Sequence, residues 1–189
     1  MTVILHALLL EIPEKVDTER LTLVAGRAGQ GAALNAAVLE SLEQLKPWMP
    51  WARKVPSLDE SETFCRESQA KWIAREMLDF AMVRRADGML VGRCGLHTID
   101  WSIPRLEVGY WVRTSCNGQG FATEATLALV ELARSHLAAR RLEITSDARN
   151  AASRRVAEKS GFALEGIRRN SRRDNAGELA DSCMYARIF

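Results

Sequence analysis

Residues 116–125, CNGQGFATEA, place two glycines around a glutamine directly before a segment with helical periodicity. Glycine adopts backbone conformations that other residues avoid, so Gly118 and Gly120 let several N–H groups of the helix start point to one spot. The helix dipole adds partial positive charge there. The stretch therefore predicts either a phosphate-binding loop or a plain strand-to-helix connection that needs glycine only to turn.

Motifs for other ligand classes are absent or incomplete. Gly118-Gln119-Gly120 lacks the third glycine of the dinucleotide fingerprint, and the sequence has no Gly-Lys-Ser or Gly-Lys-Thr of a Walker loop. The four cysteines include no C-x-x-C pair, and Cys94 with His97 gives one C-x-x-H without a second half. We therefore expect no metal site.

Hydrophobic periodicity predicts alternating strands and helices around this stretch. Upstream we expect a strand at 19–25, a helix from Leu34 to Pro47, a helix from the capping box of Ser57 and Glu60 to about Met77, and antiparallel strands at 80–85 and 89–97 that turn tightly at Asp87-Gly88. A strand at 106–112 leads into the glycines. Downstream we expect a helix to His136, a strand at 142–145, a helix at 150–160 and strands at 162–168 and 179–187 around the turn 174–178. This order predicts an α+β fold with a mixed, mostly antiparallel sheet flanked by helices.

Length and composition favour one cytoplasmic domain. The 189 residues carry a net charge of +2, and aromatic residues are not interleaved with basic ones, so we expect no nucleic-acid partner. No segment approaches the roughly 20 apolar residues needed to cross a bilayer. The opening MTVILHALLL lacks a basic leader and a cleavage site. We therefore expect residues 1–16 to form an arm or extra strand and residues 17–189 to form the domain, with scattered cysteines that fit a reducing cytoplasm.

Two motifs and their spacing resemble the acetyl-CoA-binding core of the GNAT acetyltransferases. NGQGFATEA at 117–125 follows EVGYWV at 107–112 and looks like that superfamily's pyrophosphate loop, although Asn117 stands where Arg or Gln is usual. NAASRRVAEKSGF at 150–162 resembles the family's Asn-x-x-Ser helix. TERLTL at 18–23, LESLEQLKPWMPWA at 39–52 and EVGYWV resemble the RimJ/RimL branch of ribosomal-protein N-terminal acetyltransferases.

The resemblance implies the GNAT acyl-CoA N-acyltransferase fold and acetyl transfer from acetyl-CoA to a primary amine. It also implies a set of residues that hold acetyl-CoA through the loop backbone, the end of the preceding strand and the second helix: Trp111, Val112, Asn117, Gly118, Gln119, Gly120, Phe121, Ala122, Thr123 and Asn150. Asn150 is also suited to a plain helix cap.

The implied chemistry needs a base and a hydrogen-bond donor. An α-amino group with a pKa of about 7.7–8.0 loses its proton more readily than a lysine at about 10.4, so a modest base suffices. Glu107 is our candidate, and the alternative is a solvated carboxylate or one paired with Arg105 or Arg113. Ser153 is our candidate donor to the leaving thiolate, and the alternative is a serine bonded to its own helix backbone. Some GNAT enzymes use a tyrosine further along this helix, near the position of Ala157 here.

The acceptor is less well defined by the sequence. Trp48 and Trp51, in KPWMPWA, are either core anchors or part of the acceptor cleft. RRNSRR at 168–173 is interpreted as a solvated turn that could steer an acidic acceptor. Cys116 has no adjoining histidine, so we expect direct transfer.

Three functions stay open from the sequence. The first is acetylation of protein N-termini, the second is acetylation of a small amine such as an aminoglycoside or polyamine, and the third is non-catalytic acyl-CoA binding. The retained Glu107 and Ser153 argue against the third. The oligomeric state is open as well, a homodimer included.

Overall fold

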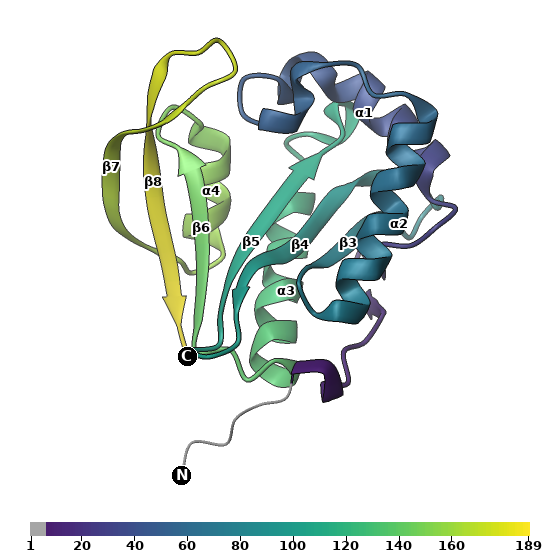
Figure 1. The fold of residues 1–189 in the computed structure, drawn as a ribbon, viewed down its shortest axis with the longest axis horizontal. Coiled ribbons are helices and arrows are strands. Elements are labelled where there is room, and N and C mark those ends of the chain that lie inside the picture. The colour runs from purple at the N-terminus through teal and green to yellow at the C-terminus, as the bar shows by residue number, and fades with distance from the viewer. Residues whose placement is uncertain (1–6) are drawn as a thin grey trace.

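An eight-stranded sheet with the order β1-β2-β3-β4-β5-β6-β8-β7 forms the centre of the fold (Figure 1). The computed structural model describes residues 7–189. Neighbouring strands are antiparallel except β5 and β6, which are parallel. The strands are β1 (Lys15–Asp17), β2 (Leu21–Ala25), β3 (Leu78–Arg84), β4 (Leu90–Asp100), β5 (Arg105–Val112), β6 (Arg141–Asp147), β7 (Ala163–Arg173) and β8 (Leu179–Ile188).

Helices cover both faces of this sheet. The pair α1 (Gly31–Leu45) and α2 (Leu58–Ala74) lies on one face, and α3 (Phe121–His136) and α4 (Ala151–Lys159) lie on the other (Figure 1). Short 3-10 helices are η1 (Ala7–Leu9), η2 (Pro50–Arg53) and η3 (Thr114–Cys116). The predicted α+β fold with a mixed, mostly antiparallel sheet is confirmed.

Local sequence signals explain several elements directly. In β2 the side chains of Leu21, Leu23 and Ala25 are buried while those between them are half-buried, as the alternation predicts. The capping box of α2 forms, because Ser57 Oγ accepts from Glu60 N at 3.1 Å and Glu60 Oε2 accepts from Ser57 N at 2.8 Å.

The predicted ends of α2 and of the hairpin were wrong. Helix α2 ends at Ala74, before Met77, because Arg75 has a left-handed φ of 59° and its N–H bonds back to Lys71 O. The hairpin turn is longer than two residues: β3 ends at Arg84 and β4 begins at Leu90. Gly88 has the expected positive φ of 74°. The φ of Asp87 is not in the positive range that a two-residue turn at Asp87-Gly88 would need.

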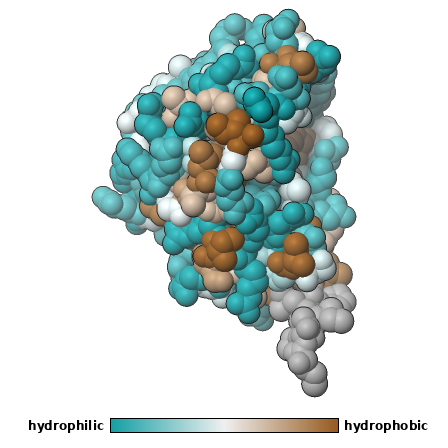
Figure 2. Space-filling model, turned by 90° about the vertical axis from the view of Figure 1, so that its left-hand side faces the viewer, coloured by the Kyte–Doolittle hydropathy of each residue, from teal (hydrophilic) through white to brown (hydrophobic). Residues whose placement is uncertain are grey.

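The prediction of a turn at 168–173 was also wrong. These residues continue β7, where Arg172 and Arg173 pair with Ala180 and Leu179 of β8. The strand is irregular between Arg168 and Arg172, and Asn170 has φ 51°. Strand β7 is an edge strand, and the face that it borders is largely hydrophilic with isolated hydrophobic groups (Figure 2). Arginines along an edge discourage pairing with further strands.

The N-terminal prediction lies partly outside the described residues, because residues 1–6 are not among them. Ala7–Leu9 form η1, and Lys15–Asp17 form β1, which pairs with β2 at one edge of the sheet. The helices of the described part are not long and apolar enough to cross a membrane.

Strands β5 and β6 stay together for only three residue pairs. Their parallel register covers Arg105 to Glu107 against Arg141 to Glu143. Beyond these pairs β5 continues to Val112 and β6 to Asp147, and the two strands diverge (Figure 1). Because α3 follows β5 and α4 follows β6, both helix N-termini lie at the open end of this wedge.

Side chains of α1 hold the segment that leads from β5 to α3. Glu40 accepts from Ser115 N at 2.9 Å and forms an ion pair with Arg113. Ser41 Oγ accepts from Thr114 N at 3.0 Å, and Gln44 accepts from the Asn117 side chain. The loop before α3 is therefore positioned by contacts distant in sequence.

The hydrogen bonds of Glu40 to this loop should make the stability of the folded protein depend on pH. Hydrogen bonds from Ser115 and Arg113 lower the pKa of Glu40 from 4.5 to about 2. A lowered carboxyl pKa stabilises the folded state above the ordinary pKa, and this contribution is lost as the pH falls from about 4.5 to about 2. We expect Glu40→Gln to lower the melting temperature at pH 7. The melting temperatures of the two proteins should approach each other as the pH falls from about 4.5 to about 2, and a constant difference across this range would contradict the assignment.

Candidate active site

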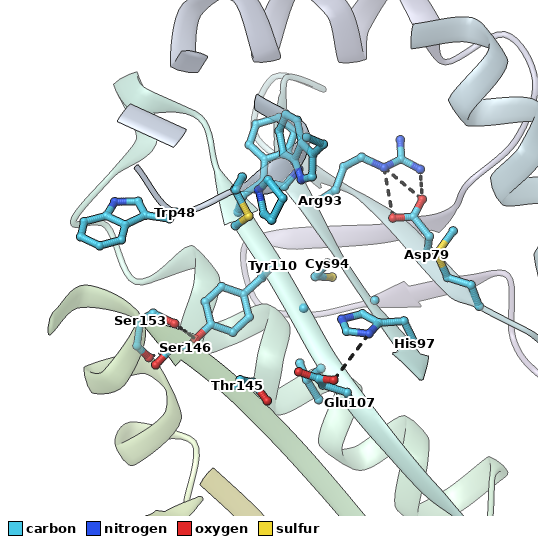
Figure 3. A pocket seen from close by; sticks show the side chains of 18 of the residues that line it. Trp48, Asp79, Arg93, Cys94, His97, Glu107, Tyr110, Thr145, Ser146 and Ser153 are labelled. Atoms are coloured by element: carbon cyan, nitrogen blue, oxygen red, sulfur yellow. Dashed lines mark hydrogen bonds and ion pairs between the residues drawn. The ribbon is translucent and has the colours of Figure 1, made fainter. Parts of the chain in front are cut away.

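A cavity of about 850 Å³ opens between the diverging strands (Figure 3). Residues 108–111 of β5 line one side and residues 144–147 of β6 line the other. Strand β4, with residues 93–97, and helix α4, with Ser153, contribute to the wall, and residues of α1, α2 and the segment 48–51 with Trp48 and Trp51 line another part of it. The wedge in the sheet is therefore open to a cavity that both strands line.

Two hydroxyl groups meet at one wall of the cavity. Tyr110 Oη lies 3.0 Å from Ser153 Oγ and also donates to Ser153 O at 3.0 Å (Figure 3). Asn150 Oδ1 accepts from Ser153 N at 3.0 Å. Asn150 therefore caps α4, which is one of the two roles expected from the sequence. Burial raises the pKa of Tyr110 to about 12, which keeps its hydroxyl protonated at physiological pH.

A carboxylate of β5 and an imidazole of β4 form a second polar group in the cavity. Glu107 Oε2 lies 4.0 Å from His97 Nδ1 (Figure 3). His97 Nδ1 also lies 2.9 Å from Thr98 Oγ1. The two cations considered as partners of Glu107 are engaged elsewhere, since Arg105 pairs with Asp100 and Arg113 pairs with Glu40. Within the described chain Glu107 has no arginine or lysine partner.

The remaining charged groups of the cavity wall are held in ion pairs. Arg93, 3% exposed, donates to Asp79 Oδ2 through Nε at 3.0 Å. Asp147 is paired with Arg172 and with Arg149. These buried pairs are structural, because each carboxylate is already satisfied by a guanidinium.

The glycine loop has the geometry expected of a ligand cradle. Gly118 and Gly120 have φ of 73° and 84°, and no side chain caps the N-terminus of α3. A Cβ on Gly118 would meet no atom within 4 Å, and one on Gly120 would meet only Arg20 Nη2, at 3.5 Å. Because the space beside these backbone atoms is open, a phosphate can approach the N–H groups of the first turn.

Side chains of the predicted cofactor residues differ in where they point. Phe121 is buried beneath the Arg20 guanidinium, so only its backbone is available to a ligand. The Asn117 side chain donates to the Gln44 side chain of α1. Asn117 therefore helps to position the loop, at a place where the family usually has Arg or Gln. Val112 packs against the core, whereas Trp111 lines the cavity. Residues 117–123 do not line the cavity itself.

Sequence reasoning missed Tyr110 and gave His97 too little weight. Tyr110 was expected only as part of the strand at 106–112, although a half-buried tyrosine needs a partner for its hydroxyl. His97 was considered only as a metal ligand with Cys94. Among residues 7–189 no three potential metal-ligating side chains cluster.

Comparisons with known proteins agree with this geometry. The GNAT acetyltransferase domain model matches residues 20–163. The ribosomal-protein-serine acetyltransferase of Escherichia coli is 28% identical over 147 residues, covering 76% of this chain and 81% of the relative. RimL, a ribosomal-protein α-N-acetyltransferase solved with coenzyme A, is 26% identical with a TM-score of 0.84, covering 94% of this chain and 97% of RimL.

A further solved structure, RimJ of Mycobacterium smegmatis with a CoA disulfide, is 25% identical with a TM-score of 0.80, covering 95% of this chain and 85% of RimJ. The family match spans most of the chain and includes both the glycine loop and the Ser153 helix. The chain therefore belongs to the GNAT acetyltransferase family, in its RimJ/RimL branch, and acetyl-CoA is its acetyl donor.

Proposed function

We propose that this protein transfers the acetyl group of acetyl-CoA directly to the α-amino group at the N-terminus of a protein. The observation that carries the proposal is one cavity that is lined both by a carboxylate without an arginine or lysine partner and by the paired hydroxyl groups of Tyr110 and Ser153. An amine that loses a proton and a thiolate that gains negative charge need these two groups.

Each group has a defined task in this proposal. Bound acetyl-CoA supplies the acetyl thioester. The backbone N–H groups at the start of α3 hold the pyrophosphate, with the loop placed by α1. Ser153 turns its O–H from Tyr110 to the sulfur as the thiolate leaves, and Tyr110, which donates to Ser153 O, keeps the two hydroxyl groups together at this wall. Glu107 accepts the proton of the amine, directly or through water.

Direct transfer is favoured over a cysteine-bound acetyl group. Cys116 is 1% exposed, and Cys94, the cysteine that lines the cavity, is 2% exposed. Burial raises the pKa of the Cys94 thiol, so its thiolate is scarce at neutral pH.

A polypeptide acceptor is supported by the mouth of the cavity and by the relatives. Trp51 is 48% exposed and its ring centroid lies 6.0 Å from that of Trp111, so aromatic surface faces an incoming chain. We propose that Trp48 and Trp51 hold the acceptor. Two of the proteins named above, the Escherichia coli relative and RimL, are ribosomal-protein acetyltransferases, which favours a ribosomal protein as the acceptor.

The acceptor class is tested by measuring free CoA release with a panel of amines. We expect peptides that begin with Ser or Ala to react, and the same peptides with a blocked N-terminus and an internal lysine to react at least about tenfold more slowly, since lysine is mostly protonated at neutral pH. If an aminoglycoside or a polyamine is turned over faster than every peptide, the proposal of a protein N-terminus is wrong and the acceptor is a small amine.

Replacement of Gly120 by Ala should weaken acetyl-CoA binding. The methyl group would occupy the open space beside the first turn of α3 and keep the pyrophosphate from the backbone. The left-handed φ also costs about 1 kcal/mol of stability. Gly88→Ala is the matched control, because Gly88 has φ 74° and equally open space but lies in the β3–β4 turn. Calorimetry should show that acetyl-CoA affinity falls about tenfold or more in Gly120→Ala and not in Gly88→Ala. Equal affinities in the two variants would exclude the glycine loop as the pyrophosphate site.

Ser153→Ala should lower kcat while acetyl-CoA affinity stays nearly unchanged. The hydrogen bond to sulfur strengthens only as charge develops, so its loss is felt in the transition state. We expect kcat to fall about tenfold to a hundredfold. Tyr110→Phe should cause part of the same loss, and the double variant should lose less than the product of the two. A wild-type kcat in Ser153→Ala would exclude Ser153 as the donor.

A further inference from the structure

The backbone of β4 changes course at His97. Thr98 has φ 49°, a left-handed conformation that is an outlier for a β-branched residue. The β4–β5 register shifts between His97 and Asp100, which marks a bulge. Bulges re-aim side chains beside active sites, and strained residues cluster there. The irregularity lies directly after the histidine that lines the cavity.

A glycine on the neighbouring strand makes room for the imidazole. His97 is the cross-strand partner of Glu107, and Gly109 is the next residue on the same face of β5. A Cβ on Gly109 would lie 2.8 Å from His97 Nε2 and 3.2 Å from His97 Cδ2, and it would meet no other atom within 4 Å. The methyl group of an alanine at 109 would therefore press on the His97 ring.

The charges of the cavity wall single out the pair of Glu107 and His97. The other carboxylates that line the cavity face permanent cations: Asp79 faces Arg93, Glu60 faces Lys54, and Asp147 faces Arg172 and Arg149. Glu107 alone among these lining carboxylates faces a histidine, the side chain that gains and loses a proton near neutral pH.

We propose that His97 is the second member of a proton relay that begins at Glu107. The proposal rests on the acetyl transfer proposed above. The ammonium N–H bond breaks and a carboxyl O–H bond forms on Glu107. That O–H bond then breaks as neutral His97 takes the proton, across the 4.0 Å gap through one water, and the imidazolium releases it to solvent. Glu107 returns to its charged form for the next amine.

The surroundings of His97 suit this task. The His97 side chain is 41% exposed, against 21% for Glu107, so the histidine is the group closer to bulk water. The Thr98 hydroxyl beside Nδ1 can donate to the neutral ring and accept from the protonated ring. The imidazole therefore has a partner in both protonation states.

The test measures kcat and acetyl-CoA affinity with whichever amine the wild type acetylates fastest. His97→Ala should lower kcat about tenfold at neutral pH without a change in acetyl-CoA affinity, and added imidazole should restore the rate in proportion to its free-base fraction. Gly109→Ala should lower kcat in the wild-type background and have no further effect in the His97→Ala background. His97→Ala should likewise have no further effect in Glu107→Gln. His136→Asn, on the exposed end of α3, is the control and should keep the wild-type rate.

Two results would overturn the relay. An unchanged kcat in folded His97→Ala would show that Glu107 exchanges its proton with water unaided. A lowered kcat that imidazole does not restore, with equal losses in the presence and absence of Glu107, would show that His97 only supports the strand. A failure of the proposed acceptor would instead appear in the wild-type protein, as lack of turnover with peptides, and would leave these comparisons intact.

Discussion

The separation of β5 from β6 after three residue pairs is the constraint on which the rest of the structure depends. Each strand is paired along its other side, β5 with β4 and β6 with β8. The sheet therefore consists of two halves joined at one end, where Leu106 and Leu142 are fully buried. Past this junction the backbone N–H and C=O groups of β5 that point toward β6 have no strand partner. Such unpaired groups can form hydrogen bonds with a ligand that carries its own amides.

The wedge is fixed from behind and across its mouth. Helix α3 packs against β4 and β5 and contacts α4, so it spans the junction. At the open end the β7–β8 turn reaches the segment that carries Trp48. Asn175 Nδ2 donates to Lys46 O at 2.6 Å and to Met49 O at 2.8 Å, and Asn175 Oδ1 accepts from Arg53 Nε at 3.0 Å. One asparagine thus ties the far half of the sheet to the acceptor side of the cavity.

Local sequence patterns predicted those parts that local physics determines. The capping box of Ser57 and Glu60, the alternation in β2 and the turning of the chain at Gly118 and Gly120 each depend on a few adjacent residues. The order of such elements was enough for the fold class. The same reasoning placed RRNSRR in a turn, because a run of arginines has no apolar alternation and its pairing with Ala180 and Leu179 appears only in the folded sheet.

Contacts across the sheet were beyond local reasoning. Tyr110 meets Ser153 from 43 residues away, and His97 meets Glu107 only because a bulge sets the register of β4 against β5. The Asp79 and Arg93 pair likewise depends on the β3–β4 register. A one-residue slip in either register would turn one member of the pair to the other face, so these partners follow from the folded sheet.

The balance of charge in the cavity connects the fold to the proposed chemistry. The lining of the described cavity carries four carboxylates and three cationic side chains, and the carboxylate left over is Glu107. An amine arrives mainly as a cation at neutral pH, so this single surplus charge attracts it to the group that must take its proton. Once acetylated, the nitrogen is a neutral amide and loses that attraction. The ion pairs that neutralise Asp79, Glu60 and Asp147 therefore support function indirectly, since each of these carboxylates left unpaired would hold the ammonium away from Glu107.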